Sequence, residues 1–147
     1  MRFRRRVVLV LLIAATSCKP KAPRELEAGP GDVAELVQRA SKEAQALGQN
    51  LVVYVSAPWC APCQMFQQQL HDGAMNATLA HLTFLKFDED RDAERLKAAG
   101  YGGEYVPRFV LPETDGKASA KRFEGVIKSN DMIAQIRSQL TQLVPPP

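Results

Sequence analysis

Histidine and cysteine are scarce in this chain of 147 residues, which has two histidines and three cysteines. A structural zinc site needs four ligands, usually of these two types at short spacings. His71 and His81 stand ten residues apart rather than three to five, and Cys18 lies in a separate N-terminal segment. We therefore expect no metal site, and we expect both histidines to be surface residues among polar neighbours.

The sequence also lacks a long hydrophobic run. The apolar stretch Val7 to Ala15 has nine residues, whereas a helix that spans a bilayer needs about 20. This stretch follows the arginine-rich start, Arg2 to Arg6, and precedes small residues, an order typical of export signals. We interpret residues 1–17 as such a signal.

Cys18 is the last residue of the short motif Ala15-Thr16-Ser17-Cys18. This order resembles the lipobox of bacterial lipoproteins, where cleavage occurs before a cysteine that carries the lipid, although Ala15 stands where leucine is usual. The resemblance implies a lipoprotein-type signal peptide and lipidation of Cys18. It also implies an anchor in the bacterial cell envelope, facing the periplasm, with the choice of inner or outer membrane left open. Ordinary cleavage nearby and an uncleaved anchor are the alternatives.

Segments outside the expected domain are short. Residues 18–31 contain three prolines or glycines in close succession at 29–31 and are expected to form a flexible tether. Residues 32–144 form the expected domain, and 145–147 a tail. Four of the 19 Lys and Arg lie in the leader, so the other 15 nearly balance the 16 Asp and Glu. This balance gives no reason to expect nucleic-acid binding, and we expect a monomer.

The strongest signal is Trp59-Cys60-Ala61-Pro62-Cys63, which follows the apolar run Leu51 to Val55. The pattern predicts a strand leading into a helix whose two cysteines, at i and i+3, share one face and can form a disulfide. Unpaired N–H groups and the helix dipole favour a thiolate at the first cysteine, and the thiolate is the reactive species. We predict an exposed, redox-active Cys60 with Cys63 as its partner. Half of a zinc site and an inert structural disulfide are the alternatives.

Hydrophobic periodicity predicts further helices and strands on either side of this motif. Helices are expected over 32–47, 60–70, 76–80, 90–99 and 130–143, the last capped by Ser129 or Asn130, and strands over 51–55, 83–87, 108–111 and 120–123. The order predicts an α/β sandwich in which a parallel part of the sheet is followed by an antiparallel hairpin.

Together these pieces resemble the thioredoxin superfamily over residues 32–143. The matching features are the strand at 51–55, the Trp-Cys-x-x-Cys motif at 59–63, Val106-Pro107 before a strand, and Gly125 after the last strand. The layout is most similar to the C-terminal domain of DsbD-type thiol reductases. The resemblance implies a three-layer α/β/α sandwich around a four-stranded mixed sheet.

The resemblance also implies roles for particular residues. Cys60 would attack a disulfide to form a mixed disulfide, and Cys63 would resolve it. Pro107 would be a cis-proline that presents the backbone of Val106 to an extended substrate, with Trp59 covering one side of the site. No cofactor is implied, because the dithiol itself carries the electrons.

Two departures from the superfamily concern the proton of Cys63. A buried aspartate six residues before the first cysteine is replaced by Tyr54, and its usual lysine partner is missing on our alignment, with Phe84 or Leu85 near that place and Lys86 the nearest cation. The proton acceptor is left open among water, Tyr54 and a backbone group.

The direction of electron flow depends on how strongly the Cys60 thiolate is stabilised. No histidine lies between the cysteines, and Ala61-Pro62 resembles the dipeptides of reductive members. We therefore favour a reductase of disulfides in exported proteins, supplied by a membrane electron donor. A disulfide oxidase or isomerase and a non-catalytic binding module are the alternatives.

Overall fold

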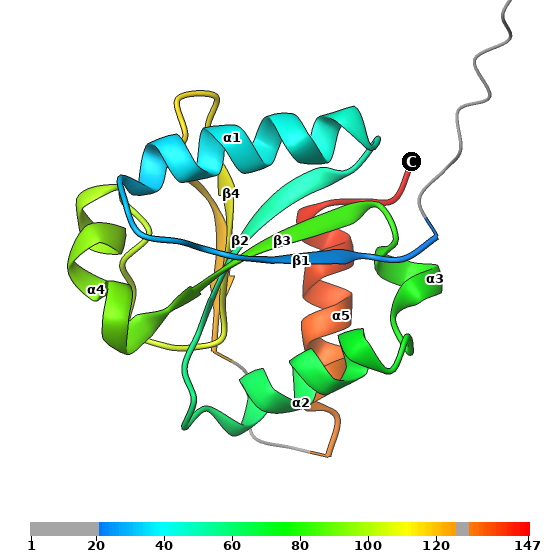
Figure 1. Cartoon of the computed structure of the whole chain (residues 1–147). Helices are drawn as coiled ribbons and strands as arrows, with labels where there is room; N and C mark the ends of the chain where they lie inside the picture. The colour runs from blue at the N-terminus through cyan, green and yellow to red at the C-terminus, as the bar shows by residue number, and fades with distance from the viewer. Residues whose placement is uncertain (1–20, 126–129) are drawn as a thin grey trace, which may run out of the picture.

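A mixed sheet of five strands forms the centre of the protein, in the order β1-β3-β2-β4-β5 (Figure 1). The computed structural model describes residues 21–125 and 130–147. The strands are β1 (Arg24–Glu27), β2 (Asn50–Ser56), β3 (Leu82–Asp88), β4 (Arg108–Pro112) and β5 (Ala118–Glu124). Strands β1, β3 and β2 are parallel, while β4 runs antiparallel to β2, and β5 to β4. The sheet is therefore parallel first and ends in an antiparallel hairpin, as the sequence predicts.

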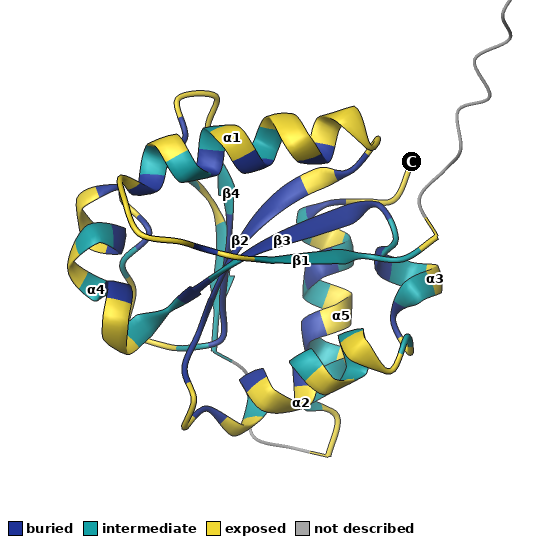
Figure 2. Cartoon of the chain, in the orientation of Figure 1, coloured by how far each residue is buried: buried dark blue, intermediate teal, exposed yellow. Residues whose placement is uncertain are grey.

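Helices cover both faces of this sheet. They are α1 (Val33–Ala46), α2 (Ala61–His71), α3 (Asn76–Leu79), α4 (Glu89–Ala98) and α5 (Met132–Leu143). Helices α1 and α4 bury one apolar cluster against the sheet, and α2, α3 and α5 bury a second on the opposite face. The central strands β2 and β3 are buried on both sides (Figure 2). These layers confirm the predicted α/β/α sandwich.

Helix boundaries agree with the local signals where these are strong. The side chain of Asp32 accepts a hydrogen bond from the backbone N–H of Glu35 at 3.0 Å and caps α1. Gly48 follows α1 with a positive φ of 70°, a conformation that costs glycine little. For α5 the expected cap was wrong: Asp131 holds the N-cap position rather than Asn130, and Ser129 lies outside the described residues.

Strand β1 corrects the expected number of strands and the expected tether. Residues 24–27 lie within the segment predicted to be flexible, yet they pair in parallel with β3 at the sheet edge. Lys86 of β3 lies between two acids of β1, 3.6 Å from Glu25 and 2.5 Å from Glu27. The strand has a single apolar residue, Leu26, so its signal in the sequence was weak, and its partners are distant in the chain. Residues 1–17 and Cys18 lie outside the described residues, so the signal and the lipidation site stay predictions.

His81 also differs from expectation, because it is buried rather than on the surface. Its side chain is 7% exposed, and its Nε2 lies 2.9 Å from the carbonyl oxygen of Val144, just after α5. The C-terminal end of α5 covers this position, and its neighbours in the chain are apolar (Leu79, Ala80 and Leu82), so the expectation of polar surroundings was wrong. His71, at the end of α2, is exposed as predicted. In the part of the chain that the structure describes, no helix is long and apolar enough to cross a membrane.

Candidate active site

The dithiol lies where β2 leads into α2. Cys60 has extended backbone angles and is the N-cap of α2, and its Sγ accepts a hydrogen bond from the backbone N–H of Cys63 at 3.2 Å. Pro62 falls in the first turn, where its missing N–H leaves no hydrogen bond unmade. An N–H donor and the positive end of the helix both stabilise negative charge on the Cys60 sulfur once the pair is reduced.

Cys60 and Cys63 are joined by a disulfide, with Cα atoms 5.2 Å apart. Of the two, Cys63 is fully buried, whereas Cys60 keeps 4% of its surface exposed. Both residues are therefore buried, and the prediction of an exposed Cys60 was wrong for this disulfide-bonded state, because Cys60 belongs to the apolar cluster that α2, α3 and α5 cover. The small exposure that remains belongs to Cys60, the residue predicted to react first.

The backbone of the facing loop has the predicted special geometry. The Val106–Pro107 peptide bond is cis. Val106 packs against the apolar clusters of both faces of the sheet, and the carbonyl of Pro107 accepts a hydrogen bond from Gly125 N–H at 2.9 Å. The loop is therefore held from both faces of the sheet and by β5, while the role of Val106 and Pro107 toward a substrate stays a prediction.

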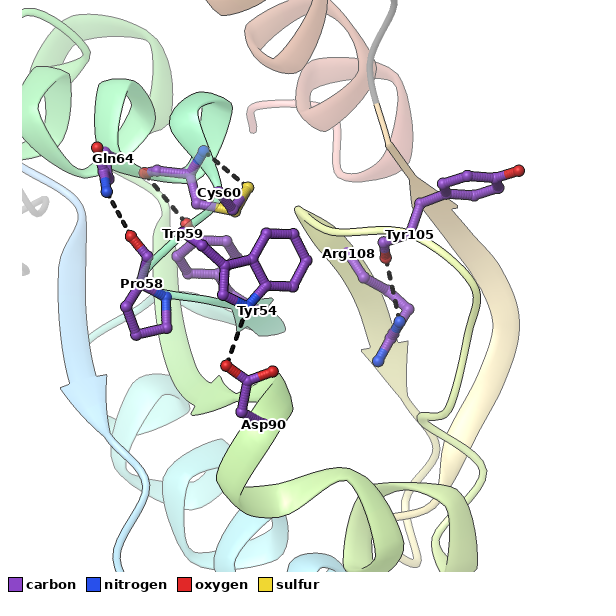
Figure 3. Close-up of a disulfide and its surroundings, with 9 residues drawn as sticks. Tyr54, Pro58, Trp59, Cys60, Gln64, Asp90, Tyr105 and Arg108 are labelled. Atoms are coloured by element: carbon purple, nitrogen blue, oxygen red, sulfur yellow. Dashed lines mark hydrogen bonds between the residues drawn. A yellow bond between two sulfur atoms is a disulfide. The ribbon is translucent and has the colours of Figure 1, made fainter.

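Trp59, the residue before the disulfide, is 66% exposed, yet its indole is fixed in place (Figure 3). Its Nε1–H donates to Oδ2 of Asp90 at 3.0 Å. Asp90 is the second residue of α4, which starts directly after β3. No contact was expected for this acid from the sequence; adjacent acids at a helix start are a weak signal, because solvated helix starts are often acidic.

A group of aromatic rings lies in the same apolar cluster as the two cysteines. Tyr54 stacks on Phe109 with ring centroids 4.8 Å apart and meets Phe66 edge to face at 5.3 Å. Its hydroxyl donates to the carbonyl oxygen of Cys63 at 3.4 Å. Burial raises the pKa of this hydroxyl well above its usual value. Tyr54 therefore stays protonated and does not act as a base for the proton of Cys63.

The sheet register revises the alignment of the expected lysine. Tyr54 lies directly opposite Lys86, not opposite Phe84 or Leu85. Lys86 is engaged by the two acids of β1 rather than by a carboxylate on β2. A cation is thus retained beside position 54, with its counter-charge on a strand that the sequence did not reveal.

Arg108 is a further residue that sequence reasoning missed. It follows the cis-proline, is 1% exposed and forms ion pairs with Glu89 and Glu124. From the sequence it was expected only to start a strand. An arginine directly after Pro107 in a strand otherwise made of apolar residues was the available signal, since charged residues are rarely buried unless paired. In the described part of the chain, no cluster of three or more His, Cys, Asp or Glu could hold a metal ion.

Comparison with known proteins agrees with this geometry. The family model described as Thioredoxin matches residues 33–138. Similar solved structures include a disulphide isomerase from Xylella fastidiosa Temecula1, with 22% identity, 78% of this chain and 95% of that chain covered, and a TM-score of 0.54. Thioredoxin NaTrxh from Nicotiana alata has 23% identity, coverage of 82% and 93%, and a TM-score of 0.53. A mutant thioredoxin from Halobacterium salinarum has 20% identity, coverage of 88% and 97%, and a TM-score of 0.51.

The chain belongs to the thioredoxin family. Its dithiol lies at the position and in the bonded state that disulfide exchange requires. The protein is therefore a thiol–disulfide oxidoreductase.

Proposed function

We propose that this protein is a membrane-tethered reductase of disulfides in exported proteins. The observation that carries the proposal is the position of the disulfide at the start of α2, where Cys60 is the N-cap and its Sγ accepts a hydrogen bond from the N–H of the fully buried Cys63. Such a pair lets one sulfur meet a partner while the other stays available for resolution. Ala61 and Pro62 lie between them, with no histidine to stabilise the Cys60 thiolate as in strong oxidants.

The reaction begins with the reduced pair. The Cys60 thiolate attacks one sulfur of the substrate disulfide, the substrate S–S bond breaks, and the other substrate sulfur leaves as a thiolate. Cys63 then attacks Cys60 Sγ, which releases the second substrate sulfur and forms the Cys60–Cys63 disulfide. Two electrons have passed to the substrate. A membrane electron donor restores the dithiol.

The position of β1 supports a tether that leaves the dithiol free. Arg24 pairs with Thr83, which in turn pairs with Leu51 near the start of β2, whereas Cys60 follows the end of β2. The chain therefore enters the domain at the end of the sheet opposite the disulfide. A lipid on Cys18 is six residues from Arg24, a span of at most about 20 Å. An anchored domain would present the disulfide away from its own membrane, toward proteins in the periplasm.

The direction of electron flow is tested by the reduction potential. We expect the Cys60–Cys63 couple, equilibrated with dithiothreitol or glutathione buffers, to lie near the value of about −270 mV typical of thioredoxin. A value near the roughly −120 mV of DsbA would instead assign the protein as an oxidase or isomerase. Unchanged function in cells carrying Cys60→Ser would favour a non-catalytic binding module.

The substrate and the anchor need separate experiments. Cys63→Ala leaves a mixed disulfide on Cys60 unresolved, so its partners can be isolated from the cell envelope and identified by mass spectrometry. Incorporation of labelled palmitate into the wild type, but not into Cys18→Ala, would support lipidation. Partners without disulfides, or equal labelling of the two proteins, would contradict the corresponding part of the proposal.

A further inference from the structure

Arg108 has the largest fully buried side chain in the described part of the protein and directly follows the cis-proline. A buried guanidinium is costly unless its charge and its N–H groups are satisfied. In Arg108 both Nη atoms have partners, whereas the buried Nε–H has none. Its position in the chain places it next to the loop at 103–107, here called the facing loop, whose Tyr105 is drawn across from Cys60 in Figure 3. The side chain lies on the same face of β4 as Val110, which belongs to the cluster beneath α1 and α4.

The partners of Arg108 come from three segments. Its Nη2 pairs with a carboxylate oxygen of Glu89, the first residue of α4. Its Nη1 donates to the carbonyl oxygen of Tyr105 at 3.1 Å and lies 3.6 Å from Oε2 of Glu124 on β5. One side chain therefore ties the facing loop to the start of α4 and to the last strand.

Glu124 completes the attachment of the loop. Its Oε2 accepts hydrogen bonds from the backbone N–H groups of Glu104, at 3.1 Å, and Tyr105, at 3.2 Å. A Cβ on Gly103 would lie 2.2 Å from Oε2 of Glu124 and 2.7 Å from Arg108 Cδ, so the backbone passes against this ion pair with no room for a side chain. The backbone of the loop therefore contacts both members of the Arg108–Glu124 ion pair.

The start of α4 also contacts Trp59. We call Trp59 and the facing loop the two walls of the site. Glu89 pairs with Arg108, while the next residue, Asp90, accepts the hydrogen bond of the Trp59 indole (Figure 3). Two adjacent residues of one helix therefore fix Trp59 beside the disulfide and, through Arg108, the loop that carries Tyr105. Both Trp59 and Tyr105 are exposed at this surface.

We propose that Arg108 is a positioning residue for polypeptide substrates: by joining Glu89, Glu124 and the Tyr105 carbonyl, it sets the facing loop at a fixed separation from Trp59 and Cys60. This inference rests on the proposed disulfide exchange at Cys60. The affinity for an extended polypeptide that contacts both walls depends on the distance between them, because a displaced loop loses part of its contacts with the polypeptide. A small disulfide that meets only Cys60 does not.

The test compares one polypeptide disulfide, insulin, with one small disulfide, hydroxyethyl disulfide. Pre-reduced protein is mixed with excess substrate, and oxidation is followed by the fluorescence of Trp59, the single tryptophan. Arg108→Lys keeps the charge and loses the fork that reaches several acceptors at once. We expect the half-saturating insulin concentration to rise about tenfold, as for the loss of one charged hydrogen bond. We expect the maximal rate with insulin, the rate with hydroxyethyl disulfide and the equilibrium with glutathione to change less than about twofold.

A matched control is available on α4. Arg95 donates to two backbone carbonyls, those of Gly29 and Gly31, and pairs with Asp92, away from the dithiol. Arg95→Lys makes the same chemical change at similar contacts, and its insulin kinetics should match the wild type. If Arg108→Lys fails to fold by circular dichroism, Glu89→Gln replaces it, since the carboxamide keeps an acceptor for Arg108 and loses the charge. We expect this variant to raise the half-saturating concentration about threefold.

Equal losses with both substrates, a lower maximal rate at an unchanged half-saturating concentration, or a shifted glutathione equilibrium would overturn the proposal, because each indicates a general effect on the fold or the dithiol. An effect of Arg95→Lys equal to that of Arg108→Lys would do so as well. Failure of the wild type to reduce either disulfide would instead refute the proposed function itself.

Discussion

Tyr54 donates a hydrogen bond from its buried hydroxyl to the carbonyl oxygen of Cys63, 3.4 Å away. The residue that replaces the superfamily aspartate thus holds the first turn of α2 through the backbone and offers no charge to the sulfur. Burial raises the pKa of the hydroxyl, so it remains a donor at every physiological pH. The proton of Cys63 must therefore leave by another route, such as the departing substrate thiolate or water.

Replacing this hydroxyl tests that conclusion. Tyr54→Phe should lower the free energy of unfolding by about 1 kcal/mol, the usual value of one hydrogen bond, because the aromatic stack on Phe109 remains. The rate of disulfide exchange should fall less than about threefold and keep its dependence on pH. Urea unfolding and stopped-flow rates between pH 6 and 9 measure both. Tyr101→Phe, which removes another buried hydroxyl that donates to a backbone carbonyl, that of Gly116, is the control. A loss in rate of a hundredfold in Tyr54→Phe alone would identify Tyr54 as part of the proton path.

The lowered pKa of Asp92 predicts how the free energy of unfolding depends on pH. Burial raises the pKa of its carboxyl, but hydrogen bonds from Arg91, from the backbone N–H of Asp88 and from Arg95 outweigh this and bring the pKa to about 2. The usual unfolded value is about 3.9, so the folded state is favoured by the ionised form. This contribution is complete above about pH 5 and is lost as the pH falls toward 2.

The corresponding variant is Asp92→Asn. It should lower the free energy of unfolding by about 2 kcal/mol at pH 7 and change it little near pH 2, where the wild-type carboxyl is itself becoming protonated. Urea unfolding at both pH values measures the difference. Glu94→Gln, an exposed acid on the same helix, should match the wild type at both. An equal cost at pH 7 and pH 2 would mean that packing, rather than charge, is responsible.

Strand β1 predicts where the domain begins. A chain starting at residue 32, the boundary expected from the sequence, would lack β1 and the buried Ala28, and would leave Lys86 without its two acids. We expect it to be less stable by about 3 kcal/mol than a chain starting at residue 21, from lost apolar burial and hydrogen bonds. Urea unfolding compares them. Equal stabilities would show that β1 adds nothing to the fold.

From the place of the two cysteines in α2 we predict the order in which they are alkylated. In the reduced protein, iodoacetamide should modify Cys60 at least about tenfold faster than Cys63, because the helix start favours the Cys60 thiolate and Cys63 is fully buried. Site-resolved mass spectrometry over time measures the two rates. In Cys60→Ser, the remaining thiol should react slowly. Equal rates at the two sites would remove the basis for assigning Cys60 as the nucleophile.

Much of the fold could be predicted because its signals are local. The cap at Asp32, the continuous apolar run of β2 and the spacing of Cys60 and Cys63 each act within one element or its immediate neighbours. The cis bond before Pro107 was an expectation from resemblance, and the backbone confirms it. The signal peptide, the lipid on Cys18 and the identity of the partners stay predictions.

What only the tertiary structure decided involves residues distant in the chain. β1 exists because Glu25 and Glu27 meet Lys86, and His81 is buried because the end of α5 returns to cover it. Arg108 gains its role from acids on α4 and β5. The sequence alone favoured the chemistry, since two cysteines three residues apart at a helix start are typical of a redox pair, and the bonded pair and the family agree with it. Folding determined how deeply the two cysteines are buried and how the loop before β4 is held, because burial and charge pairing depend on contacts that no local pattern encodes.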